Sequence, residues 1–103
     1  MNKLVTGLVM GTVLFSGSVL AGDPVAGKAK SMVCGACHGV AGISAIDGYP
    51  NLAGQNEKYI ISSIKAYRSK ERNGGNAAIM QPQAGILSDQ DIENLAAYYS
   101  QMK

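Results

Sequence analysis

The pattern of apolar and polar positions predicts a helix in the middle of the chain. In the segment NEKYIISSIKAYRSKERNGG, residues 56–75, Ile60, Ile64 and Tyr67 recur at the i, i+4, i+7 spacing of one helix face. The Asn-Gly-Gly sequence at 73–75 contains residue types that commonly end helices. We therefore expect an amphipathic helix that ends at this sequence.

A second apolar face predicts a helix in SDQDIENLAAYYSQMK, at residues 88–103. Its members are Ile92, Leu95, Ala96 and Tyr99. Ser88, with Asp91 three residues later, forms a capping box in its acidic variant. Acidic side chains in the first turn also suit the positive end of the helix dipole. The helix is therefore expected to begin directly after Ser88.

A third helix is expected earlier in the chain. Asp23 and Pro24 combine an acidic cap with a proline at the first helical position, and the helix would run through VAGKAKSMVCGACH and stop near Gly39. The segments 39–55 and 76–87 show neither helical periodicity nor strand alternation, so we expect two long loops. Such loops are unusual in a small chain unless they are functional. The pattern thus predicts an all-α fold in which something other than side chains fills the space between the helices.

The first residues have the features of a signal peptide. Lys3 is followed by an apolar run from Leu4 to Phe15, and then by small residues that lead to Ala21. The uncharged stretch is long enough for a retained membrane anchor, but its glycines and hydroxyl residues dilute its hydrophobicity. We therefore expect residues 1–21 to be removed, with export to a bacterial periplasm and no membrane insertion after cleavage.

Residues 22–103 would then form one small domain, near the size at which a hydrophobic core alone is marginal. The formal net charge of the chain is +2, and there is no block of Lys or Arg residues. These features argue against a nucleic-acid partner.

The segment MVCGACHGVAG, residues 32–42, holds both cysteines and the only histidine of the chain. A structural zinc site needs about four such ligands, and the chain has three. A thioredoxin-type redox pair expects a βαβ context that is absent from the pattern. A disulfide between Cys34 and Cys37 would close a very short loop, would stabilise little, and would leave His38 unexplained.

Covalent haem attachment accounts for every part of the segment, because C-x-x-C-H is the attachment sequence of c-type haem. Cys34 and Cys37 lie one helical turn apart, so both can form thioethers along one haem edge, and His38 can ligate the iron. A second ligand must come from elsewhere, and methionine is the ordinary partner. Met32 lies on the same helix as Cys34, and Met102 lies at the C-terminus, so we expect Met80 to be the axial ligand.

Three segments in order carry a family resemblance: GKAKSMVCGACHG, YPNLAGQNEKYI and AAIMQPQAGILSDQDIENLAAYY. Through them the whole of residues 22–103 resembles the class I c-type cytochromes, in the branch of small bacterial monohaem electron carriers. The resemblance implies an all-α class I cytochrome c fold, with three main helices and two long loops wrapped around one covalently bound haem c.

The resemblance also implies further residue roles. The carbonyl of Pro50 would accept a hydrogen bond from the ring of His38. Gly27 would lie where the first helix crosses the last, against Tyr98 or Leu95. Related sequences often place an arginine shortly before the axial methionine, whereas this chain has none nearer than Arg72. The propionate partners are therefore left open.

The implied function is that of a periplasmic carrier of single electrons, with no bond chemistry and no enzymatic activity. It would shuttle between redox proteins such as membrane respiratory complexes or periplasmic oxidoreductases. Five basic residues could steer an acidic partner or simply form a solvated helix face: Lys58, Lys65, Arg68, Lys70 and Arg72. Two alternatives stay open: a haem subunit of a periplasmic dehydrogenase, and a five-coordinate gas-binding protein with a labile Met80.

Overall fold

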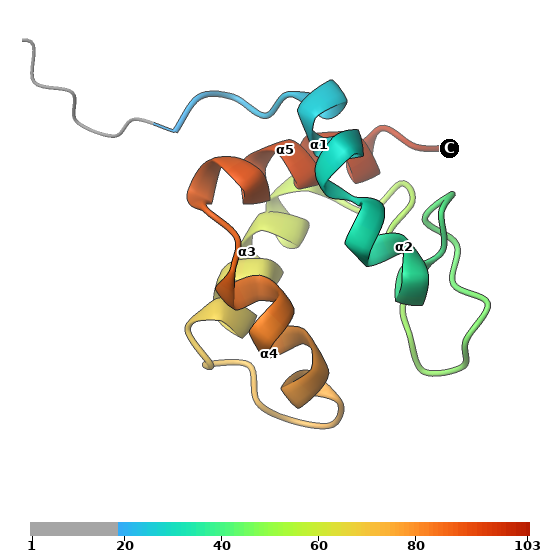
Figure 1. The fold of residues 1–103 in the computed structure, drawn as a ribbon, viewed down its shortest axis with the longest axis vertical. Helices are drawn as coiled ribbons and strands as arrows, with labels where there is room; N and C mark the ends of the chain where they lie inside the picture. The colour runs from blue at the N-terminus through green and yellow to red at the C-terminus, as the bar shows by residue number, and fades with distance from the viewer. Residues whose placement is uncertain (1–18) are drawn as a thin grey trace, which may run out of the picture.

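The computed structural model describes residues 19–103, and in this part of the chain all regular structure is helical (Figure 1). The helices are α1 (Pro24–Lys30), α2 (Met32–His38), α3 (Glu57–Arg68), α4 (Ala77–Gly85) and α5 (Asp89–Ser100). The predicted all-α fold is confirmed. The predicted signal peptide falls mainly on residues 1–18, outside the described residues.

The first predicted helix is in fact two helices, α1 and α2, which meet at Ser31. The carboxylate of Asp23 caps α1 by accepting a hydrogen bond of 2.9 Å from the backbone N–H of Val25. At the junction, the Ser31 hydroxyl donates to the carbonyl of Lys28 over 2.7 Å. Serine hydroxyls compete in this way with the helical backbone pattern. The expected single helix is therefore wrong by one break, placed just before the cysteine segment.

Helix α3 begins as predicted but ends earlier, at Arg68 and not at residues 73–75. The Asn56 side chain caps its first turn by accepting from the N–H of Tyr59 at 3.0 Å. Past the C-cap, Lys70 adopts a left-handed backbone with φ 65°, which turns the chain away from the helix axis. The apolar face has its last member at Tyr67, so nothing buried requires the helix to continue.

The second predicted loop contains a helix, and this expectation is wrong. Ala77, Met80 and Ala84 lie at i, i+3 and i+7 of α4, and both alanines are buried. The sequence conceals this face because alanine gives little hydrophobic contrast and because the apolar Ile79 is exposed. Pro82 also indicates a loop, since it lacks the N–H that a helix interior needs. Met80 is therefore a helical residue and not a loop residue.

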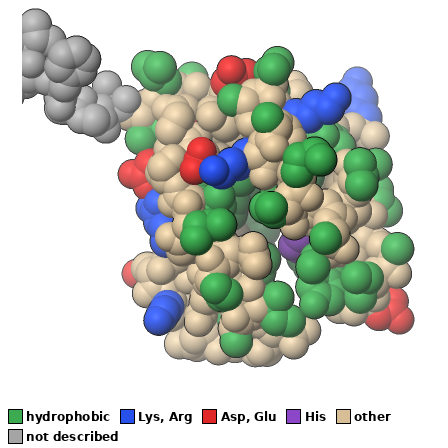
Figure 2. Space-filling view, in the orientation of Figure 1, with side chains coloured by type: hydrophobic (Ala, Val, Ile, Leu, Met, Phe, Trp, Pro, Cys, Tyr) green, Lys and Arg blue, Asp and Glu red, His purple; other side chains and the backbone are tan. Residues whose placement is uncertain are grey.

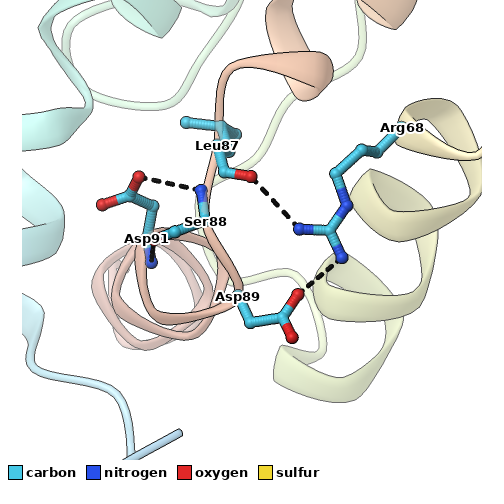
Figure 3. Close-up of polar contacts among 5 residues, drawn as sticks. All are labelled: Arg68, Leu87, Ser88, Asp89 and Asp91. Atoms are coloured by element: carbon cyan, nitrogen blue, oxygen red, sulfur yellow. Dashed lines mark hydrogen bonds and ion pairs between the residues drawn. The ribbon is translucent and has the colours of Figure 1, made fainter. Parts of the chain in front are cut away.

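Helix α5 begins with the predicted capping box (Figure 3). The N–H of Asp91 donates to the Ser88 hydroxyl over 3.0 Å, and the N–H of Ser88 donates to the Asp91 carboxylate over 3.0 Å. Arg68 of α3 reaches the same turn, where it donates to the carbonyl of Leu87 at 3.1 Å and pairs with Asp89 at 2.5 Å. These contacts fix the end of α3 against the start of α5.

The core lies where α5 packs against α1 and α3, while α4 packs on α3. The predicted face of α5, Ile92, Leu95, Ala96 and Tyr99, is buried throughout. Gly27 of α1 lies at the crossing, where a Cβ would come within 2.8 Å of the Cβ of Tyr98 and still closer to the backbone of Asn94. The expected contact between the first and last helices is confirmed, with Tyr98 as the aromatic partner. Only a residue without a side chain allows this approach.

Candidate functional site

A cavity of about 510 Å³ lies between the helices and the first loop. Its lining residues come from α2, the second half of the first loop, α3, the segment between α3 and α4, α4, Leu87 and α5. Figure 2 shows the hollow, with the histidine side chain at its edge and hydrophobic side chains around it. The apolar lining includes Leu52, Ile60, Ile64, Tyr67, Leu95 and Tyr99. Its size falls in the range of small-molecule and cofactor sites.

His38, the last residue of α2, is buried in the cavity wall with 6% of its surface exposed. Its Nδ1 lies 2.8 Å from the carbonyl oxygen of Pro50. A carbonyl only accepts, so Nδ1 carries the hydrogen and, in the neutral ring, Nε2 keeps a lone pair. That tautomer is the one that a metal-ligating histidine needs. The ring of Tyr49 packs edge-on at 6.2 Å between centroids.

Three contacts hold Pro50 in place within the first loop. The N–H of Leu52 donates to the carbonyl of Gly42 over 2.8 Å. The side chain of Asn51 accepts from the N–H of Ser44 over 2.7 Å, and the Ser44 hydroxyl donates to the carbonyl of Cys37 over 3.0 Å. The loop is thus tied to itself and to α2, so the acceptor for His38 is set by backbone geometry.

Cys34 and Cys37 occupy one turn of α2, and both line the cavity. They are not joined in a disulfide. Burial raises the pKa of the Cys34 thiol, while a hydrogen bond from the Tyr99 side chain acts in the opposite direction. Cys34 also packs against the core that contains Tyr99. Cys34 is therefore in contact with the core that α5 helps to form.

Of the three methionines in residues 19–103, the cavity lining includes only Met80. Met32 is 80% exposed on α2, and Met102 packs against the core of α5. The structure therefore brings together four of the expected site residues around one cavity: Cys34, Cys37, His38 and Met80. Pro50 joins them through its contact with His38.

Arg72 is a cavity residue whose position the sequence pattern did not predict. Its guanidinium carbon lies 4.6 Å from the centre of the Tyr67 ring, in a cation–π arrangement. The pKa of Tyr59 is lowered by hydrogen bonding to Ser63 and to Arg72. The side chains of Tyr59, Tyr67 and Arg72 all line the cavity. No periodicity could have located Arg72, because it lies in the irregular segment between α3 and α4.

The five basic residues around α3 divide into two groups. Arg68 is engaged with Asp89 and Leu87, and Arg72 faces the cavity. Lys58, Lys65 and Lys70 form no ion pair with any residue of the described segment 19–103. The lysines alone are therefore available to an external partner.

The donor set and the walls together fit a haem group. Within residues 19–103, no group of three or more His, Cys, Asp or Glu side chains could hold a bare metal ion. Two thiols one turn apart, a correctly protonated imidazole and a thioether instead surround an apolar cavity. These are the groups that attach and ligate an iron porphyrin. In the same residues, no helix is both long enough and apolar enough to cross a bilayer.

Comparison with known proteins gives a consistent result. The family model described as cytochrome c matches residues 25–103. Cytochrome c-554(548) of Halomonas halodenitrificans is 56% identical over 80 residues, which cover 78% of this chain and 96% of that protein.

Two solved structures are also similar. Reduced recombinant cytochrome c4 from Pseudomonas stutzeri superposes with a TM-score of 0.73 at 42% identity, covering 81% of this chain and 47% of that one. Thiosulfate dehydrogenase (TsdBA) from Marichromatium purpuratum gives a TM-score of 0.74 at 29% identity, covering 84% of this chain and 21% of that one. The chain thus spans about half of the cytochrome c4 and about a fifth of the dehydrogenase.

Proposed function

The chain belongs to the cytochrome c family as a class I c-type cytochrome, and from that premise we propose that it carries single electrons by means of one haem c. The observation that carries the proposal is the shared cavity of Cys34, Cys37, His38 and Met80. The chain has two cysteines and one histidine, so it offers attachment residues for one such group. Bound haem c supplies one-electron iron chemistry.

Each residue of the site has a separate task in this proposal. Cys34 and Cys37 would hold the group by thioether bonds, and His38 would ligate the iron through Nε2. The carbonyl of Pro50 orients the ring of His38 and keeps its Nδ1 protonated. Met80, on α4, would be the second iron ligand from the protein. Because two side chains would ligate the iron, we expect the protein to transfer electrons and to catalyse no bond chemistry.

Arg72 and Tyr59 are the proposed partners of the haem propionates. Both line the cavity, and Arg72 is held in place by the ring of Tyr67. The backbone carbonyl of Arg72 also accepts from the side-chain amide of Gln81 at 3.1 Å, which ties the segment to α4. A guanidinium can pair with a carboxylate through two parallel hydrogen bonds. Arg72 thereby replaces the arginine that related sequences place closer to the axial methionine.

We further propose that the mature protein comprises residues 22–103 and works in a bacterial periplasm, after removal of residues 1–21. The proposal rests on the charged start, the apolar run and the small residues before Gly22. The proposed electron donors and acceptors of the protein are redox proteins, such as membrane respiratory complexes or periplasmic oxidoreductases. Lys58, Lys65 and Lys70 would steer acidic faces of those proteins.

A second candidate function is a haem domain within a dehydrogenase complex. The observation that favours it is the similarity to the thiosulfate dehydrogenase from Marichromatium purpuratum. In that case the protein would hold a permanent partner and not diffuse between several. Purification under mild conditions distinguishes the two: a carrier elutes at the mass of one chain, whereas a subunit elutes with a second polypeptide.

The axial ligands are tested by spectra and potentials of the purified protein. Thioether sulfur stabilises reduced iron, so Met80→His is expected to lower the potential by several steps of about 59 mV, each a tenfold change in equilibrium constant. Met80→Ala should lose the weak far-red band of methionine-ligated ferric iron and should bind carbon monoxide when reduced.

Met32→Leu and Met102→Leu are the matched controls and should keep both band and potential. If either control abolishes the band while Met80→Ala retains it, the assignment of Met80 is wrong. Carbon monoxide binding by the reduced wild type at neutral pH would instead favour a five-coordinate gas-binding protein.

A further inference from the structure

Two adjacent tyrosines of α5 have different surroundings. Tyr99 is 2% exposed and lines the cavity, together with Cys34 and His38. Tyr98 is absent from the cavity lining and instead packs against Gly27 at the crossing with α1. The two rings lie 5.1 Å apart at an angle of 56°. Tyr99 is therefore the tyrosine of α5 that lines the cavity and belongs to the core cluster against which Cys34 packs.

The backbone carbonyl of Tyr99 accepts hydrogen bonds from two different segments of the chain. It accepts from the N–H of Gly54 at 2.9 Å and from the N–H of Met102 at 3.2 Å. The first contact comes from the end of the first loop, and the second comes from the C-terminal turn. A residue fixed in this way can place its hydroxyl group reproducibly against its neighbours.

Cys34 packs against the core cluster that contains Tyr99, and both residues line the cavity. The side chains of Cys34 and Ser31 are also the polar groups whose hydrogen bonding affects the pKa of Tyr99. The Ser31 hydroxyl already donates its hydrogen to the carbonyl of Lys28 at 2.7 Å, so its oxygen can only accept. A cysteine sulfur that has formed a thioether has lost its hydrogen and likewise only accepts. Tyr99 is thus the donor of this group, and of the two acceptors only Cys34 lines the cavity.

We propose that Tyr99 is a positioning residue for the Cys34 thioether, whose sulfur accepts the phenol hydrogen while the ring closes that edge of the cavity. The proposal rests on the proposed haem attachment at Cys34. The phenol O–H directs the positive end of its dipole toward a group in covalent contact with the porphyrin. That orientation stabilises the reduced, more electron-rich state, so the hydroxyl raises the reduction potential.

The test compares Tyr99→Phe with Tyr98→Phe in the haem-loaded protein. Tyr99→Phe should keep covalent haem and helix content. Its equilibrium constant for reduction should fall about threefold, which lowers the reduction potential by about 28 mV, since about 59 mV corresponds to a tenfold change. Resonance Raman spectra should show a shifted C–S stretching band for one thioether. Tyr98→Phe removes an equal hydroxyl from the neighbouring residue and should leave both the potential and the C–S bands unchanged.

Several outcomes would overturn the proposal. One is a Tyr99→Phe protein with the potential and C–S bands of the wild type, and another is an equal shift in Tyr98→Phe. A third is a Ser31→Ala protein whose potential falls as far as that of Tyr99→Phe, because the hydroxyl would then act through Ser31. Haem that is extracted from the wild type by acidified organic solvent contradicts the proposed function itself, which separates the two failures.

Discussion

The crossing region and the cavity wall differ in how closely they are packed. The crossing region is formed by residues 22–31 and α5, and the cavity wall is formed by the first loop, α3 and α4. At the crossing, backbone approaches backbone at Gly27, and the Asn94 side chain accepts from the N–H of Asp23 at 2.9 Å. Ile92 and Leu95 are fully buried beneath it. In the cavity wall, Leu52 and Ile64 are only partly buried, and Ile79 is 43% exposed.

The difference shows in which region the protein's own side chains achieve close packing. Where Gly27 meets α5, the crossing region reaches close packing with protein atoms alone, as a normal core does. Leu95 and Tyr99 of α5 also line the cavity. The cavity wall presents its apolar side chains to a space of about 510 Å³. Its packing is completed only when a group of matching shape and polarity fills that space. The first region is a conventional helix interface, whereas we expect the stability of the second to depend on the group that it binds.

The largest expected effect comes from preventing haem attachment. In a Cys34→Ala, Cys37→Ala protein, any haem should be extracted by acidified organic solvent, and the chain should be largely unstructured at physiological temperature. Hydrogen exchange should be fastest in residues 39–87, with whatever protection survives confined to α1 and α5. A cooperative thermal transition with near-native helix content in the haem-free chain would mean that the cavity wall packs without haem.

A smaller effect is expected from a side chain at the crossing. Gly27→Val places a Cβ against the backbone of Asn94, and overpacking of this kind costs about 1–3 kcal/mol. The melting temperature should fall by about 4–8 °C for each kcal/mol in a domain of this size. Gly85→Val is the matched control, because nothing lies within 4 Å of its added Cβ and Gly85 is not part of the cavity lining. Equal melting temperatures for both variants would mean that the crossing is not closely packed in solution.

The capping box at the start of α5 should contribute less to the free energy of unfolding. Ser88→Ala removes the acceptor for the N–H of Asp91, and the loss of such a cap typically costs about 1 kcal/mol. Urea denaturation of the haem-loaded protein measures this change. Ser62→Ala is the control, since its exposed hydroxyl only donates to the carbonyl of Tyr59 within the same helix. A stability equal to that of wild type in Ser88→Ala would show that water replaces the cap.

The smallest expected effect is a pH dependence of the crossing region. The pKa of Asp91 is lowered, first by the hydrogen bond from the Ser88 backbone and also by Lys30 of α1, 3.4 Å away. The unfolded chain therefore binds the proton more readily, and stability is lost as the pH falls below the ordinary carboxyl value of 3.8. Melting temperatures between pH 6 and pH 3 should fall less steeply in Asp91→Asn than in wild type. Parallel curves would show that this contact has no part in acid unfolding.

The sequence predicted the crossing region well because its signals are local or strongly periodic. The capping box and the apolar face of α5 can be recognised from the residues alone. Gly27 required the family resemblance, since its role depends on a helix far along the chain. The break at Ser31 was missed because a single serine does not alter the helical pattern on either side.

The cavity wall was predicted less completely, for a physical reason. Residues that face a ligand need not obey the periodicity of a protein core, so α4 was expected to be a loop. Met80 was still selected, because Met32 was expected on the helix of Cys34 and Met102 lies at the C-terminus, although Met80 itself was expected in a loop and lies in α4. Arg72 was not assigned to the site because its position depends on the ring of Tyr67 and on the chain reversal after α3.

The contact between the two ends of the domain also sets conditions on how the chain assembles. Asp23 and Asn94 bond across 71 residues, so the crossing closes nearly the whole domain into one loop. Closure of a flexible loop of that length costs about 4 kcal/mol of chain entropy beyond a constant term. Cys34 lies only a short distance beyond α1, inside that loop. A haem attached before closure would shorten the effective loop by collecting the cavity residues around it, so we expect the crossing to form faster in attached chains than in bare ones.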